Sequence, residues 1–171
     1  MNINLKNNSE KEQKTKKLLE GLFNRFNLDK WILCDEILIE EGGRGKAFPF
    51  IILSAGLNED ILLAQFLHEQ SHWVHGNIVG AENMDKAIDE LKEIFKSVPI
   101  DKPEGGGSEK STYIHLIICR LEFLALKELL GEEKAMNIVS NNNNYTWIRK
   151  TILDSSPIID QIIERYFPRI Y

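Results

Sequence analysis

The sequence lacks most of the features that mark secreted, membrane-spanning or nucleic-acid-binding proteins. Its 171 residues include only two cysteines, Cys34 and Cys119, which excludes a disulfide framework and favours a reducing compartment. Lys and Arg total 21 against 26 Asp and Glu, a formal net charge of -5, whereas nucleic-acid binders normally carry a basic patch. The longest nearly uncharged run, residues 47–57, is too short to span a bilayer. We therefore expect neither a nucleic-acid partner nor membrane insertion.

The N-terminal residues 1–16 are polar and lack the apolar core of a signal peptide. We expect them to form a polar tail, and the protein to be soluble and cytoplasmic. Hydrophobic residues make up 43% of the chain, an ordinary fraction that is sufficient for one hydrophobic core. The sequence thus predicts one domain over residues 17–171.

Two runs rich in Ile, Leu and Phe, residues 31–40 and 46–54, are separated by several glycines. They predict two strands joined as a hairpin, and Pro49 places the second strand at a sheet edge because proline lacks an N–H donor. Apolar residues repeated every three or four positions predict helices over residues 17–26, 58–75, 83–97, 111–130, 145–153 and 157–167. This order indicates an α+β fold, mainly helical, with a small β-sheet preceding the helix over residues 58–75.

That helix contains the motif HExxH, in which His68 and His72 stand four residues apart and Glu69 follows the first histidine. Histidines at this spacing project from one helical face, so both imidazoles can reach a single zinc ion. Glu69 lies beside the metal, where it can take a proton from zinc-bound water as a general base. Leucines and aromatic residues cover the other side of the helix, which is typical of an active-site helix. The sequence gives no account of Gln70, which falls within this apolar arc.

A catalytic zinc normally has three protein ligands, and Glu122 is the predicted third. It lies in an apolar stripe of the helix over residues 111–130, where an unpaired carboxylate is costly. The alternative is a buried salt bridge, for instance with Arg149. His115 lies on the same face about 10 Å along the helix axis, so His115 and Glu122 cannot comfortably ligate one ion.

We therefore predict His115 to be a hydrogen-bond donor to the transition state, with a buried structural histidine as the alternative. Tyr113 and Tyr145 are further candidates for stabilising the oxyanion. His75 is predicted to lie at the rim of the site or to support a ligand, rather than to bind the metal itself. The two cysteines lack a CxxC spacing and are predicted to be small buried residues rather than ligands.

His68, Glu69 and His72 on one helix, with Glu122 on a later one, resemble the gluzincin group of zinc metallopeptidases. The short layout is most similar to the minigluzincins, and the resemblance spans about residues 46–131. It implies a zincin-like fold and a zinc-dependent metallopeptidase. It also implies that the strand before the active-site helix, here residues 48–54, binds the substrate as an added edge strand.

The sequence departs from related patterns at two places. The extended metzincin motif is absent, because His75 stands where that motif has glycine and Ile78 where it has a third histidine. Many gluzincins carry an acidic residue four positions after the glutamate ligand to orient the first histidine. Here that position is Leu126, so the supporting residues must come from elsewhere.

Three functions remain open at this point. The leading one is hydrolysis of peptide bonds in a peptide or protein substrate by zinc-bound water that Glu69 activates. The second is a non-catalytic zinc protein in which the metal stabilises helix packing, and such a site has no need of Glu69. The third is an interaction module in which the motif is coincidental. The substrate sequence, self-inhibition by a chain segment and the oligomeric state are not readable from these residues.

Overall fold

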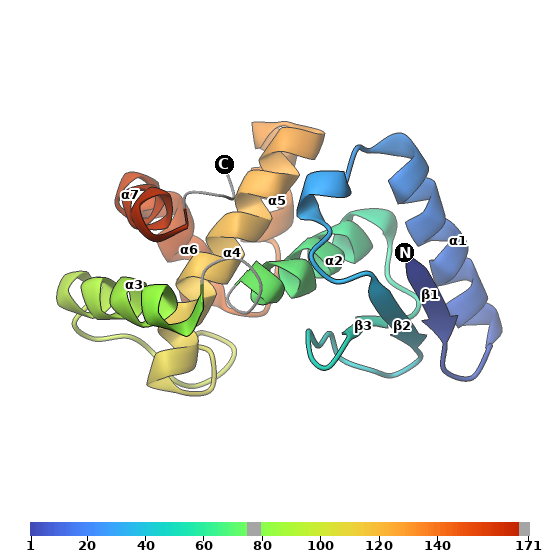
Figure 1. Ribbon diagram of the computed structural model, residues 1–171, viewed down its shortest axis with the longest axis horizontal. Coiled ribbons are helices and arrows are strands. Elements are labelled where there is room, and N and C mark those ends of the chain that lie inside the picture. The colour runs from blue at the N-terminus through green and yellow to red at the C-terminus, as the bar shows by residue number, and fades with distance from the viewer. Residues whose placement is uncertain (75–79, 168–171) are drawn as a thin grey trace. The chain divides into compact units, whose positions relative to one another are not determined.

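The structure is a computed structural model that describes residues 1–74 and 80–167. These residues fall into two compact units that are divided between residues 73 and 74. Within the described residues the fold is mainly helical and includes one small parallel sheet (Figure 1). The predicted α+β class is thereby confirmed at the level of secondary-structure content.

The first unit combines the sheet with two long helices. In the sheet the strand order is β1 (Asn2–Leu5), β2 (Glu36–Glu40) and β3 (Ile51–Ser54), with Ile37 of β2 opposite Ile51 of β3. Ile37, Ile39, Ile51 and Leu53 are fully or almost fully buried, because alternate residues of each strand face the core. The elements in chain order are β1 (Asn2–Leu5), α1 (Glu10–Arg25), η1 (Asp29–Trp31), β2 (Glu36–Glu40), β3 (Ile51–Ser54) and α2 (Glu59–Val74).

The N-terminal residues differ from the polar tail predicted over residues 1–16. Asn2–Leu5 form β1, which pairs in parallel with β2, and α1 already begins at Glu10. The side chain of Ser9 caps this helix by accepting from the Glu12 N–H, while the Glu12 side chain accepts from the Ser9 N–H. This capping box is visible in the sequence as Ser9 followed three residues later by Glu12.

The predicted hairpin is also different, because β2 and β3 are parallel rather than antiparallel. The connecting residues 41–50 bring Lys46 to the outer side of β3, where it forms an antiparallel bridge with Ile52. β3 is at the edge of the ladder, as Pro49 predicted. Strand direction depends on the path of the connection, which the apolar pattern of two short runs does not specify.

The second unit is helical, and α4 (Glu109–Leu130) packs against the other four helices of the unit. Ser108 caps α4 by accepting from the Ser111 N–H, and Gly131 ends it with a φ of 84°, a left-handed value that glycine adopts without strain. The helices are α3 (Gly80–Ile94), α4 (Glu109–Leu130), α5 (Glu132–Ser140), α6 (Thr146–Asp154) and α7 (Ser156–Tyr166). The sequence does not predict α5. The bounds of the other four helices lie within a few residues of the predicted bounds.

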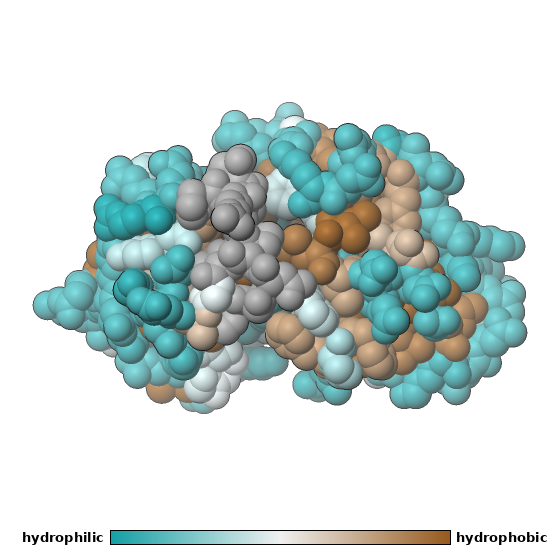
Figure 2. Space-filling view, viewed as in Figure 1, coloured by the Kyte–Doolittle hydropathy of each residue, from teal (hydrophilic) through white to brown (hydrophobic). Residues whose placement is uncertain are grey.

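Hydrophilic residues dominate the face shown in Figure 2, and hydrophobic residues gather over part of the first unit. In the ranges that the structure describes, no helix is both long and apolar enough to cross a membrane. Residues 75–79 lie outside the described residues. The predicted helix end at residue 75, the predicted position of His75 and the departure at Ile78 fall within this range.

Candidate metal and catalytic site

α2 carries the HExxH motif on a helix whose start is fixed by Asn58. The Asn58 carboxamide oxygen accepts a hydrogen bond from the Ile61 N–H. Glu59 and Asp60 place negative charge in the first turn, where it interacts favourably with the positive end of the helix dipole. Four apolar side chains of this helix are buried with at most 1% exposure: Leu62, Leu63, Phe66 and Leu67. The helical placement of the motif is therefore confirmed.

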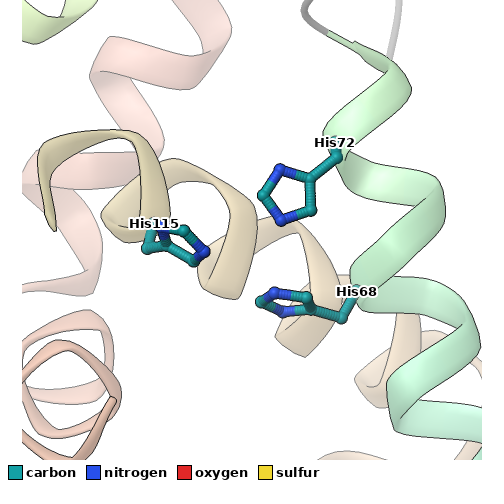
Figure 3. A group of neighbouring side chains, drawn as sticks. All are labelled: His68, His72 and His115. Atoms are coloured by element: carbon teal, nitrogen blue, oxygen red, sulfur yellow. The ribbon is translucent and has the colours of Figure 1, made fainter. Parts of the chain in front are cut away.

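His68 and His72 project from the same side of α2, one turn apart (Figure 3). Their ring centroids are 5.1 Å apart. One imidazole nitrogen of His68 lies within 4.8 Å of one imidazole nitrogen of His72. His68 is 8% exposed. Two imidazole nitrogens so placed are a donor set that suits zinc, whose bonds to histidine nitrogen are about 2.0–2.1 Å long.

Glu69 is buried, with an exposure of 6%, and the chain around Gly45 packs directly on it. A Cβ atom added at Gly45 would clash with Oε1 of Glu69 and lie 2.9 Å from Nε2 of Gln65. The residue at position 45 must therefore be glycine if the Glu69 carboxylate is to stay where it is.

Residues 43–48, called the 43–48 segment below, run alongside α2 from Gln65 to Trp73. At one end the hydroxyl of Ser54 donates to the Gly43 carbonyl, and Gln65 donates to that hydroxyl and accepts from the Ser54 N–H. At the other end the Trp73 indole donates to the Ala47 carbonyl at 2.8 Å. The motif helix and the end of β3 thus hold this segment at both ends.

The outer edge of β3 is already occupied by this segment at one residue. Ile52 donates to the Lys46 carbonyl at 2.8 Å and accepts from the Lys46 N–H at 3.1 Å. An added peptide strand at this edge would meet the same backbone groups of Ile52.

Gln70, which the apolar pattern of the helix leaves unexplained, fixes the chain just before β2. Its side-chain oxygen accepts from the backbone N–H groups of Leu33 and Cys34, and its nitrogen donates to the Cys34 carbonyl. The side chain is 2% exposed, so these bonds satisfy a polar group that would otherwise be costly in the core. No local sequence signal connects residue 70 with residue 34.

On α4, Glu122 is fully buried and forms a bidentate ion pair with Arg149 of α6. Nη1 and Nη2 of the guanidinium donate to the two carboxylate oxygens at 3.0 and 3.1 Å. Burial disfavours the charged guanidinium, but the Glu122 carboxylate more than offsets this and raises the pKa of Arg149 above its ordinary value. The salt-bridge alternative for Glu122 is confirmed, while its role as a zinc ligand stays a prediction.

His115, also on α4, is held by its Nδ1 atom. Nδ1 lies 2.7 Å from the Ser111 carbonyl oxygen and 3.3 Å from the Ser111 hydroxyl. The ring is 8% exposed and lies against the Tyr145 ring, with centroids 4.4 Å apart and planes at 30°. Figure 3 shows His115 projecting from α4. This histidine therefore has a fixed ring plane and a fixed partner for one nitrogen.

The remaining candidates are placed as follows. The Tyr113 hydroxyl donates to the Phe95 carbonyl at 2.6 Å and the ring is 1% exposed, so this tyrosine supports the helix packing and is not available as an oxyanion donor. Burial raises its pKa. Cys34 and Cys119 are free thiols and buried, as predicted.

Comparison with family models, with curated proteins and with solved structures gives no match for this chain. The functional conclusion therefore depends on the residues themselves.

Proposed function

We propose that this protein is a zinc-dependent peptidase in which His68 and His72 of α2 ligate the metal, a residue of α4 completes the ligand set and Glu69 is the general base. The observation that carries the proposal is the arrangement on α2. The imidazoles of His68 and His72 lie side by side on one face of the helix, and Glu69, between them in the sequence, carries a buried carboxylate. A structural zinc site has no need of that carboxylate.

Zinc at such a site would lower the pKa of a bound water molecule and would polarise the carbonyl group of the scissile peptide bond. The residues of the chain do the rest. The Glu69 carboxylate accepts the proton of the attacking water and delivers it to the departing amine nitrogen. The backbone at Gly45 packs on the Glu69 carboxylate and restricts its movement, which keeps the base oriented.

The predicted substrate is a peptide in an extended conformation, because β3 is an edge strand directly before the motif helix. A peptide bound in this way forms hydrogen bonds with the backbone N–H and C=O groups on the outer edge of β3. At Ile52 these groups are bonded to Lys46, so binding at this edge requires the 43–48 segment to be displaced or the peptide to add beyond it.

The same contact favours a second candidate, a zinc protein without catalytic activity. In that case the 43–48 segment covers Glu69 and the β3 edge permanently, and the metal serves to stabilise helix packing. Glu69 separates the two candidates, since only the peptidase depends on its basic oxygen.

The test is the variant Glu69→Gln, which keeps the size of the side chain and removes its basicity. We expect zinc to remain bound while cleavage of a mixed peptide library falls by about 100- to 10,000-fold, the usual loss for one general base. The measurement is cleavage by mass spectrometry together with zinc content. The exposed Glu93 provides a matched control, and Glu93→Gln should cleave like the wild type.

Two outcomes contradict the peptidase proposal. Equal cleavage by the wild type and Glu69→Gln would remove Glu69 from the reaction. A zinc-loaded wild type that cleaves no peptide of the library would favour the non-catalytic candidate.

A further inference from the structure

We infer that His115, and not Glu122, is the residue of α4 that ligates the metal of the proposed site. The inference rests on the proposed function and changes the ligand set predicted from the sequence. Because His115 and Glu122 lie about 10 Å apart along the axis of α4, one ion takes one of them. The contacts of each residue within its own unit decide between the two.

The contacts of Glu122 argue against ligation. Both of its oxygens accept from the Arg149 guanidinium, and both partners are nearly or fully buried, at 0% and 5% exposure. The carboxylate charge is thus already compensated. A dication on the same carboxylate would lie close to the buried guanidinium, and two positive charges at such short range in a poorly hydrated site repel each other.

The contacts of His115 favour ligation. A carbonyl oxygen only accepts, so the 2.7 Å contact with the Ser111 carbonyl places the proton on Nδ1. The Ser111 hydroxyl, which donates to the Gly106 carbonyl, is likewise an acceptor toward Nδ1. In the neutral imidazole Nε2 then carries the lone pair. Histidines that ligate metals almost always donate their other N–H to a carbonyl or a carboxylate in this way.

The Tyr145 ring, which lies tilted against the His115 ring, further restricts the plane of the imidazole, so ordering this side chain costs little when the metal binds. With the histidines of α2, His115 would give the metal three imidazole nitrogens. Catalytic zinc sites with three histidine ligands retain a position for water. In this assignment Glu122 and Arg149 hold α4 and α6 together, and His115 is a ligand instead of the hydrogen-bond donor predicted from the sequence.

The experiment compares zinc binding by full-length variants at the two positions. His115→Ala removes the proposed ligand. Glu122→Gln removes the charge of the alternative, and Glu122→Leu combined with Arg149→Met removes both members of the ion pair without leaving an unpaired buried charge, a replacement that is often neutral for stability. Circular dichroism melting checks that each variant is folded. Zinc affinity is measured by competition with a chromophoric chelator, and cobalt is substituted to record the visible spectrum.

We expect His115→Ala to weaken zinc binding by more than about 100-fold, beyond the range that loss of a supporting residue causes. Its cobalt spectrum should change and should recover on addition of imidazole, which replaces the missing ligand. Both Glu122 variants should lose less than about tenfold in affinity and keep the wild-type cobalt spectrum.

The reverse pattern, with His115→Ala retaining wild-type affinity and spectrum while folded Glu122 variants lose the metal, would overturn the inference and leave the peptidase proposal intact. Failure of the wild type to bind zinc would instead overturn the proposed function, and the inference with it.

Discussion

Gly45 is the residue whose size matters most to the proposed general base. A methyl group there would meet Oε1 of Glu69 and Nε2 of Gln65, and both atoms are at the ends of side chains that can move. The fold can therefore accommodate alanine at position 45, but the Glu69 carboxylate cannot keep its present position.

We predict that Gly45→Ala keeps its fold and its zinc and loses peptidase activity. A displacement of a catalytic group by about 1 Å can lower a rate about 100-fold. The measurement is the cleavage rate at saturating zinc, with zinc content and melting temperature recorded on the same sample.

The control for this variant is Gly21→Ala. Gly21 lies within α1, and a Cβ there has no neighbour within 4 Å, so the substitution should raise helix stability by about 0.5–1 kcal/mol and leave the cleavage rate unchanged. Unchanged cleavage by Gly45→Ala would show that the position of the Glu69 carboxylate is not critical.

The sequence was informative at the residue scale only where the chemistry is local. His68, Glu69 and His72 lie within five positions of one helix, so their shared face follows from helix geometry. The partner of Glu122 was predicted as an alternative because a buried carboxylate needs compensation. The contacts of Gln70 with Leu33 and Cys34 and the packing of Gly45 on Glu69 depend on tertiary structure, and no spacing in the sequence encodes them.

At the scale of elements, the start of α1 depends on the carboxyl group of Glu12. This side chain is fully buried and accepts from the backbone N–H groups of Asn7, Ser9 and Glu41. Burial by itself raises the pKa of the carboxyl, but the backbone hydrogen bonds outweigh it and lower the pKa below its ordinary value of 4.5.

This lowered pKa predicts a specific loss of stability in acid. A carboxyl whose pKa is lower in the folded than in the unfolded state stabilises the fold above the unfolded pKa, and this stabilisation disappears as the pH falls through the folded pKa. The variant Glu12→Gln should therefore be less stable than the wild type at about pH 6, and the difference should shrink towards about pH 3. The measurement is urea unfolding across this range, and a constant difference at all pH values would contradict the assignment.

The elements were predicted unevenly, for reasons that the structure makes clear. α4 ends at Leu130 as predicted, because a long apolar stripe and Gly131 define it locally. α5 was not predicted, because its nine residues follow Gly131 directly and form a short helix without a side-chain cap. β1 was missed because only Ile3 and Leu5 are apolar in it, and a short polar strand is recognisable only by its pairing with β2.

At the scale of the whole molecule, a metal that binds the folded chain and not the unfolded one stabilises the fold by mass action. The proposed activity and the proposed ligand assignment both depend on zinc binding.

Native mass spectrometry of the metal-free protein, titrated with zinc, measures this binding without depending on activity. We expect one zinc ion per chain in the wild type and none at stoichiometric zinc in His68→Ala, which lacks one of the two α2 ligands but keeps all residues of α4. A wild type without zinc, or a His68→Ala variant that retains one zinc per chain, would contradict it.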